Sequence, residues 1–150
     1  MNQKFIFAFI LLFAISVTNA ITLKKRTTEF LKCNSLDPLS FISVIVSPNP
    51  PVPGQNATFS VSGVLGQDIK ENGVIIIAFR TDDCVPLGVY PTTSVPPTKA
   101  GIYFGATIEA TVPRNFKLHN STVYYINAYL ENGNVPIGCA EACFGQRCKN

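Results

Sequence analysis

The chain has 150 residues, of which 47% are hydrophobic and 14% charged, and its formal net charge at pH 7 is +3. This length predicts one domain. The weak charge, without a basic stripe interleaved with aromatic residues, excludes an electrostatic nucleic-acid-binding surface. A chain this apolar must bury much of its hydrophobic surface or hold a ligand against it.

Residues 1–20 have the organisation of a secretory signal peptide. Lys4 precedes residues 5–17, which are apolar apart from Ser16, and Thr18 and Ala20 are small residues at the cleavage positions. A membrane-spanning helix needs about 20 apolar residues, so this run is too short for one. We therefore expect cleavage after Ala20 and a protein that is secreted or lies in the lumen of the secretory or endolysosomal pathway.

Residues 21–32 are expected to be an N-terminal tail or a short propeptide, ahead of a domain at residues 33–150. Cleavage after Ala20 removes one charged residue, Lys4, so the formal charge falls from +3 to +2. Lys24, Lys25 and Arg26 are either a solvated basic segment or a dibasic processing site. Cutting after Arg26 would remove three more positive charges and leave −1.

The clearest structural signal is a strand, a rigid corner and a second strand within residues 43–63. Residues 43–46 are β-branched and apolar, as strands prefer. Four prolines between residues 48 and 53 fix φ and remove backbone donors, and Gly54 lets the chain turn. From Ala57 the sequence alternates between apolar and polar residues, which predicts a strand with one buried face and one face in water.

Further strand signals recur along the chain at spacings typical of β-sandwiches. Asn72-Gly73 and Asn132-Gly133 are favoured hairpin turns. Residues 82–100 contain four prolines and are predicted to be a long irregular segment. The strands expected after the first two are a short one within residues 63–70, then residues 74–79, a short one near 87–90, and residues 102–112, 123–131 and 135–144.

The sequence offers little to an enzyme. Its one histidine, His119, lies in a polar segment, and no nucleophile motif such as G-x-S-x-G is present. Asp82 and Asp83 are too few oxygen ligands for calcium. Phosphate-binding and dinucleotide-binding motifs are absent too. We expect no catalytic residue, no metal site and no cofactor.

Five cysteines and two glycosylation sequons fit an oxidising secretory route. The cysteines are Cys33, Cys84, Cys139, Cys143 and Cys148. In that compartment they should form disulfides rather than hold zinc. Because their number is odd, one thiol stays free or pairs with another molecule. The sequons begin at Asn56 and Asn120, both at strand starts or loops, where an oligosaccharide fits.

A series of short motifs along residues 33–144 resembles the ML (lipid-recognition) domain family. The corner Ser47-Pro48-Asn49-Pro50-Pro51-Val52-Pro53-Gly54-Gln55 is the most specific of them. The others, in order, are Cys33 before Asp37-Pro38, then Ser62-Gly63, Asp83-Cys84, Val112-Pro113 and Ile137-Gly138-Cys139. This family includes fungal phosphatidylglycerol/phosphatidylinositol transfer proteins and the lysosomal cholesterol-transfer protein. The chain departs from the fungal pattern in lacking a second mid-chain cysteine and in carrying Cys143 and Cys148.

The resemblance implies an all-β fold, an immunoglobulin-like sandwich of two antiparallel sheets with an apolar cavity between them. It also implies a disulfide between Cys33 and Cys139. We add Cys143–Cys148 as a second bond, which leaves Cys84 odd. The implied function is non-enzymatic binding or transfer of one sterol or phospholipid by a monomer that contacts membranes transiently.

The candidate lipid-binding residues are apolar positions of the expected inner faces. Both faces of residues 74–79 are apolar, and the proline-rich segment 85–100 is expected to border the mouth. The candidates are Phe59, Val61, Ile76, Ala78, Phe104, Ile108, Tyr124, Ile126 and Leu130. The alternative function is an extracellular adhesion or recognition module with a solid core and no lipid, and a secreted hydrolase using His119 is a third.

Overall fold

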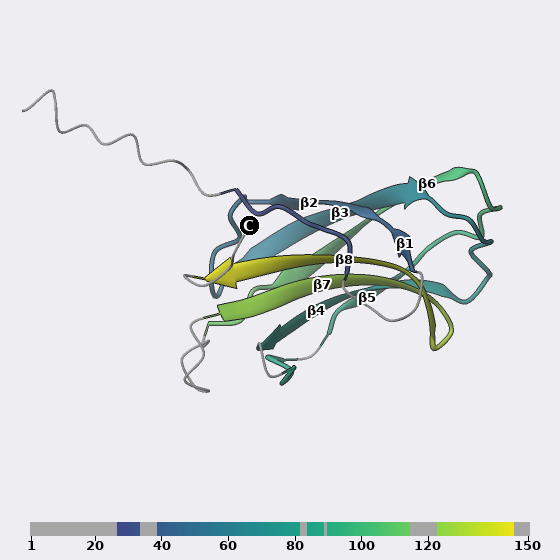
Figure 1. Ribbon diagram of the computed structural model, residues 1–150. Helices are drawn as coiled ribbons and strands as arrows, with labels where there is room; N and C mark the ends of the chain where they lie inside the picture. Colours follow the sequence, from purple (N-terminus) through teal and green to yellow (C-terminus); the bar gives the residue numbers. More distant parts are fainter. Residues whose placement is uncertain (1–26, 34–38, 82–83, 89, 115–122, 146–150) are drawn as a thin grey trace, which may run out of the picture.

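The computed structural model describes residues 27–33, 39–81, 84–88, 90–114 and 123–145, and within them the chain folds into two layers of β-strands (Figure 1). No helix occurs in this part of the chain, so it contains no helical membrane span. The strands are β1 (Ser40–Phe41), β2 (Ser43–Ser47), β3 (Asn56–Val64), β4 (Gly73–Thr81), β5 (Thr92–Ser94), β6 (Tyr103–Thr111), β7 (Val123–Asn132) and β8 (Val135–Gly145).

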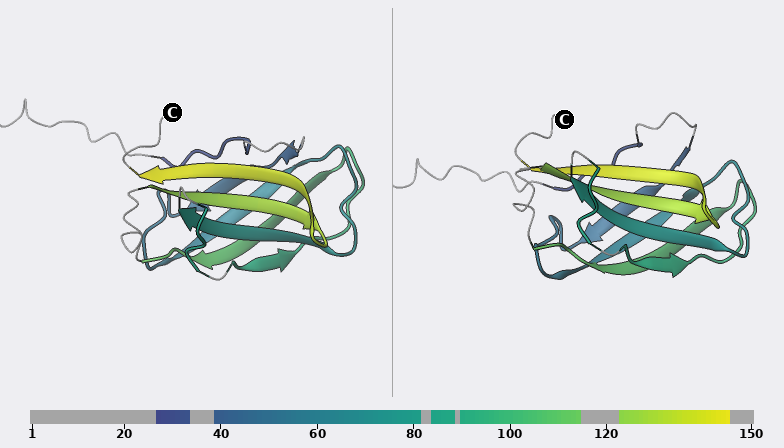
Figure 2. Two further views of the ribbon diagram at one scale, coloured as in Figure 1. Left: turned by 60° about the horizontal axis from the view of Figure 1, so that its bottom comes forward. Right: turned by 90° about the horizontal axis from the view of Figure 1, so that it is seen from below.

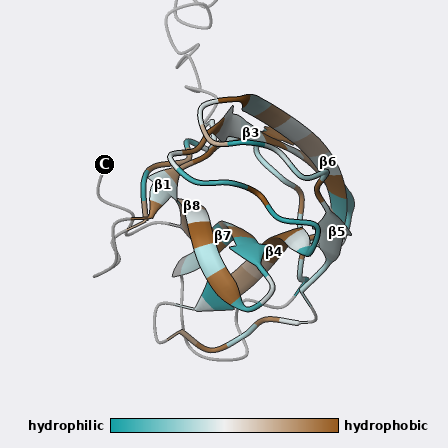
Figure 3. Cartoon of the chain, turned by 90° about the vertical axis from the view of Figure 1, so that its right-hand side faces the viewer, coloured by the Kyte–Doolittle hydropathy of each residue, from teal (hydrophilic) through white to brown (hydrophobic). Residues whose placement is uncertain are grey.

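The strands form a five-stranded sheet in the order β1-β8-β7-β4-β5 and a three-stranded sheet in the order β2-β3-β6. Every pairing is antiparallel except the short parallel contact of β1 with β8. Viewed from one end, β3 and β6 form one layer, and β8, β7 and β4 form the other (Figure 3). This arrangement confirms the expected all-β fold of two packed sheets.

The alternation of apolar and polar residues explains why the two sheets stack. Along β3, Ala57, Phe59 and Val61 are buried, whereas Asn56 and Ser60 are exposed. Residues of β6 follow the same period, and the bands of differing hydropathy on both strands are visible in Figure 3. One apolar face of each sheet therefore turns toward the other, and the polar face meets water.

The first corner forms as the sequence predicts. Gly54 adopts φ +79°, and its N–H donates to the carbonyl oxygen of Val112 at 2.7 Å. Val112 in turn donates to Gln55 at 2.9 Å. The corner after β2 is thus tied to the end of β6, two segments that are far apart in the sequence.

The inner face of β4 is the opposite of the one we chose from the sequence. β4 pairs with β7 so that Ile75, Ile77 and Phe79 lie opposite Leu130, Ala128 and Ile126. Directly paired residues of an antiparallel ladder share a face, and this set is buried in the core. Ile76 and Ala78 therefore lie on the outer face, where Ile76 is only half-buried. Their assignment to the cavity wall is corrected.

Two of the short strands also differ from expectation. Of the strand expected near residues 87–90, the described residues 87, 88 and 90 belong to no strand, and β5 instead pairs Thr92–Ser94 with the first half of β4. Pro86 and Pro91 lack an N–H, which prevents a continuous ladder along this stretch. Residues 65–70 form no strand, although Ile69 exchanges two backbone hydrogen bonds with Thr98 at 2.8 and 3.0 Å.

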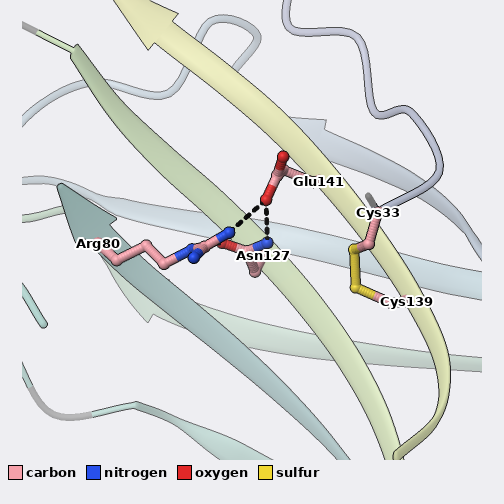
Figure 4. Close-up of a disulfide and its surroundings, with 5 residues drawn as sticks. All are labelled: Cys33, Arg80, Asn127, Cys139 and Glu141. Carbon is pink, nitrogen blue, oxygen red and sulfur yellow. Dashed lines mark hydrogen bonds and ion pairs between the residues drawn. A yellow bond between two sulfur atoms is a disulfide. The ribbon is translucent and has the colours of Figure 1, made fainter. Parts of the chain in front are cut away.

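Residues 27–33 belong to the packed domain, which differs from the expected boundary at Cys33. Phe30 is buried in the core, and Leu31 exchanges two backbone hydrogen bonds of 2.8 Å with Glu141 of β8. Two residues further along the same pairing, Cys33 forms a disulfide with Cys139 (Figure 4). The predicted Cys33–Cys139 bond is confirmed.

Candidate functional site

A hollow of about 410 Å³ lies between the two sheets, along the side where β4 and β6 face each other. One wall is formed by Phe79, Leu87, Gly88 and Pro91, and the other by Glu109, Ala110, Thr111 and Pro113. β5 and β6 border this side of the sandwich, and residues 27–33 and β8 border the other (Figure 2). The lining is mixed, because Phe79, Leu87 and Ala110 are apolar whereas Glu109 and Thr111 are polar.

Residues 84–88 cover the hollow because they fold back on the second half of β4. Leu87 donates its N–H to the carbonyl oxygen of Phe79 at 2.8 Å, and Thr81 donates to Val85 at 3.0 Å. Pro91 accepts a bond of 3.1 Å from Ile77. Leu87 packs partly buried against the core. The proline-rich segment thus borders the hollow, and both Leu87 and Pro91 line it.

The predicted wall residues lie deeper than the hollow. Seven of the nine belong to one buried apolar cluster: Phe59, Val61, Phe104, Ile108, Tyr124, Ile126 and Leu130. None of the nine lines the hollow itself. Phe79 connects the two regions, because its ring lies edge-on to that of Phe59 with 6.2 Å between centroids. Whether these residues contact a lipid stays a prediction.

Sequence reasoning missed the residues of the hollow for two reasons. Phe79 and Ala110 lie in predicted strands at apolar positions, but their access to a side opening depends on what packs beside them. Leu87 and Pro91 lie in a segment without periodicity, which carried no signal for orientation.

Burial changes the acid–base properties of Tyr124, a predicted wall residue on β7. Its side chain is 4% exposed, and its ring packs on that of Phe144 with 5.0 Å between centroids. Removal from water disfavours the phenolate and raises the pKa of Tyr124 far above its ordinary value. Tyr124 is therefore a neutral, largely apolar part of the interior.

A polar cluster lies on the outer face of the five-stranded sheet, away from the hollow. Arg80 of β4 pairs with Glu141 of β8, and both contact the buried Asn127 of β7 (Figure 4). Arg80 also lies 5.6 Å from the centre of the Tyr125 ring. Burial alone would lower the pKa of Arg80, but the hydrogen bond to Glu141 and nearby negative groups raise it overall. Arg80 thus links β4 to β7 and β8 on this face of the sheet.

The remaining cysteines differ in state. Cys84 is an exposed free thiol whose Sγ accepts a bond of 3.0 Å from Nη1 of Arg80. Cys143 is disulfide-bonded. Its predicted partner Cys148 lies outside the described residues, so the pairing of these two stays a prediction.

The catalytic and metal alternatives gain no support from the described part of the chain. It contains no group of three or more histidine, cysteine or acidic side chains arranged to hold a metal ion. His119, Asp82 and Asp83 lie outside the described residues, as does the sequon residue Asn120. The other sequon residue, Asn56, is exposed at the start of β3.

A β-sandwich whose apolar interior opens along one side is an architecture suited to holding an apolar ligand. The chain belongs to the ML domain family, whose sequence profile matches residues 27–144. The disulfide and this membership point to an extracellular or lumenal protein.

Two known proteins illustrate the similarity. A phosphatidylglycerol/phosphatidylinositol transfer protein of Debaryomyces hansenii (strain ATCC 36239) is 38% identical over 55 residues, covering 35% of this chain and 28% of that protein. The chain therefore matches less than a third of that relative's length. Chicken MD-1, solved in complex with lipid IVa, superposes with a TM-score of 0.51 at 18% identity, covering 81% of this chain and 93% of MD-1. The MD-1 match shows the immunoglobulin-like sandwich fold.

Proposed function

We propose that this protein is a secreted, non-enzymatic carrier that holds the apolar part of one lipid between its two sheets. The observation that carries the proposal is the hollow on the β4/β6 side, which leads to the buried apolar cluster through Phe79. Membership in the ML domain family supports lipid binding or transfer in general. The finer proposal is a phospholipid or sterol as ligand, bound by a monomer that contacts membranes transiently.

The volume and the chemistry of the hollow suit the entry of an acyl chain. Ligand pockets measure about 300–1,000 Å³, and the hollow of about 410 Å³ lies within this range. Each wall contributes apolar side chains, Phe79 and Leu87 on one and Ala110 and Pro113 on the other, beside the polar Glu109 and Thr111. A lipid chain entering here would lie against Phe79 first and then reach Phe59 and its neighbours.

The energetics suit exchange rather than permanent capture. A sixteen-carbon chain exposed to water costs about 13 kcal/mol, at roughly 0.8 kcal/mol per methylene. An apolar cavity removes most of this cost, as a bilayer does. Transfer between the two environments is therefore close to balanced, and it needs neither a cofactor nor an energy source.

A fluorescent phospholipid and a fluorescent sterol titrated into the purified wild-type protein test this proposal. Leu87→Asp places a carboxylate in the wall of the hollow, where burial of a charge without a partner is strongly disfavoured. We expect lipid binding to fall by at least about tenfold, which equals 1.4 kcal/mol. Val135→Asp is the matched control, because Val135 is 63% exposed in the β7–β8 hairpin and should bind as wild type does.

Folding of each variant is checked by its cooperative unfolding transition. Loss of binding in folded Leu87→Asp with normal binding in Val135→Asp supports entry through the hollow. A folded wild-type protein that binds no phospholipid, sterol or fatty acid overturns the carrier and leaves the adhesion or recognition module.

A further inference from the structure

The sequon at Asn56 occupies a defined position in the fold. Asn56 is the first residue of β3 and is exposed. It pairs with Thr111, the last residue of β6, and the Thr111 hydroxyl donates to Oδ1 of Asn56 at 2.7 Å. Thr111 also lines the hollow. The amide of Asn56 is therefore held beside both the hollow and the end of β6.

β6 is an edge strand of the three-stranded sheet. In the three-stranded sheet it pairs with β3 on one side, and among the described residues no strand pairs with its other side. Its nine residues, Tyr103–Thr111, carry one charged side chain, Glu109. An exposed edge of this length is a template for pairing with another chain, and proteins usually block such edges with charges, prolines or a covering segment.

The sequence of β6 also permits pairing between the β6 strands of two copies of the chain. If two copies of β6 paired antiparallel about Thr107, Glu109 of one copy would lie opposite Gly105 of the other. The two carboxylates would then not face each other, so charge repulsion would not prevent the pairing. The side chains of β6 by themselves therefore do not prevent this pairing.

We infer that Asn56 carries an N-linked oligosaccharide that shields the free edge of β6 from pairing with a second copy of the chain. The sugar is attached to β3, one strand away from the edge strand β6, at the end of the sheet beside the hollow. The inference does not depend on lipid binding. The Cys33–Cys139 disulfide supports it, because disulfides persist in the oxidising route in which asparagine-linked sugars are also added.

The donor is an oligosaccharide linked to a polyisoprenyl diphosphate. A bond forms between Nδ2 of Asn56 and C1 of the first sugar, the bond from C1 to the diphosphate oxygen breaks, and Nδ2 gives up one proton as the diphosphate leaves. The product is a secondary amide whose Oδ1 remains an acceptor, so the Thr111 hydroxyl can donate to it in the folded chain as it does without the sugar.

Occupancy is tested on the full chain expressed in a eukaryotic host with Asn120→Gln in the background, so that only one sequon remains. We expect the intact mass to fall on treatment with peptide N-glycosidase and to lack the sugar in Thr58→Ala. Thr58→Ser keeps the sequon and should keep the sugar. An unglycosylated Asn56 in the wild-type sequon overturns the inference.

Shielding is tested by sedimentation equilibrium of the glycosylated protein and of Asn56→Gln. We expect Asn56→Gln to self-associate at least about tenfold more tightly. Thr107→Lys, which places a charge on the edge strand, should reverse this effect. Ser60→Lys is the matched control, because Ser60 pairs with Thr107 on the inner neighbour β3 and leaves the edge unchanged. Equal self-association of the two forms overturns the shielding, and so does failure of Thr107→Lys to reverse it.

Discussion

The two long sides of the sandwich are built differently. On the N-terminal side, β1 pairs with β8, the chain passes through the buried Ile42, and β2 joins the other sheet. Residues 27–33 pair with β8 on the same side and contribute Phe30 to the core. On the hollow side, formed by β5, residues 84–88 and β6, residues 95–102 carry the chain from the five-stranded sheet to the three-stranded one.

This difference predicts that one side mainly determines the stability of the fold and that the other determines access of a ligand to the hollow. The N-terminal side has a disulfide, backbone pairing and a buried aromatic ring, so its opening would break many interactions together. The hollow side is covered by residues 84–88, in which Cys84 is a free thiol and only Leu87 packs against the core. Changes on the first side should act mainly on the free energy of unfolding, and changes on the second mainly on ligand binding.

The largest effect is expected from removing the disulfide of the N-terminal side. The bond joins residues separated by 106 positions, and loss of so long a loop closure costs about 3–5 kcal/mol on the chain-entropy model. We expect Cys33→Ser/Cys139→Ser to lower the free energy of unfolding by this amount in urea titrations. The remaining folded protein should bind lipid normally. Cys84→Ser is the control, and an equal loss in both proteins contradicts the prediction.

The next effect tests the polar cluster on the outer face of the five-stranded sheet. Glu141→Gln removes the charge that pairs with Arg80, and both side chains are about three-quarters buried, with 26% and 22% of their area exposed. We expect a loss of about 1.5–3 kcal/mol in the free energy of unfolding, typical of hydrogen bonds to charged groups. Glu131→Gln on β7 should change little. Indistinguishable denaturation midpoints for the two variants would refute a stabilising role of the cluster.

A size series at Leu87 sharpens the account of the hollow side. Leu87→Trp fills part of the hollow and should weaken lipid binding by about tenfold, equivalent to 1.4 kcal/mol. Leu87→Ala enlarges the hollow and should bind at least as well as wild type. Because Leu87 is only partly buried, both should change the free energy of unfolding by less than a fully buried leucine would. Weaker binding by Leu87→Ala than by Leu87→Trp contradicts the order.

The smallest effect is expected at the end of the hollow side where the chain crosses between the sheets. Asp68 accepts bonds from Lys99 Nζ at 2.8 Å and from the N–H of Ala100 at 2.9 Å. The bond from Lys99, followed by that from Ala100, lowers the pKa of Asp68 below its ordinary value of 3.8. The folded state thus binds its proton less readily than the unfolded state does.

The stabilisation by Asp68 is therefore present above its unfolded pKa and disappears as the pH falls through its folded pKa. We expect Asp68→Asn to lower the melting temperature slightly at neutral pH and to match wild type well below pH 3.8. Glu71→Gln, in the neighbouring turn, is the control. A difference that persists unchanged in acid would contradict this account.

The sequence by itself determined the long strands and most of their faces, but not the short strands. In β3, β6 and β7, strict alternation identified the buried positions, because side chains of a strand point to opposite faces in turn. The prolines and Gly54 located the first corner, since they restrict or permit φ locally. The Cys33–Cys139 bond came from the resemblance to the ML domain family and not from spacing. All of these features depend on local chemistry or on a pattern shared by relatives.

The tertiary structure alone decided which face of β4 is buried and where the interior opens. Both faces of β4 are apolar, so the choice came from its register with β7, which sets Ile77 opposite Ala128 and Phe79 opposite Ile126. The hollow depends on the distance between Leu87 and the last residues of β6, segments whose positions no local pattern relates. Such features arise from contacts between distant parts of the chain, and for this reason only the folded structure shows them.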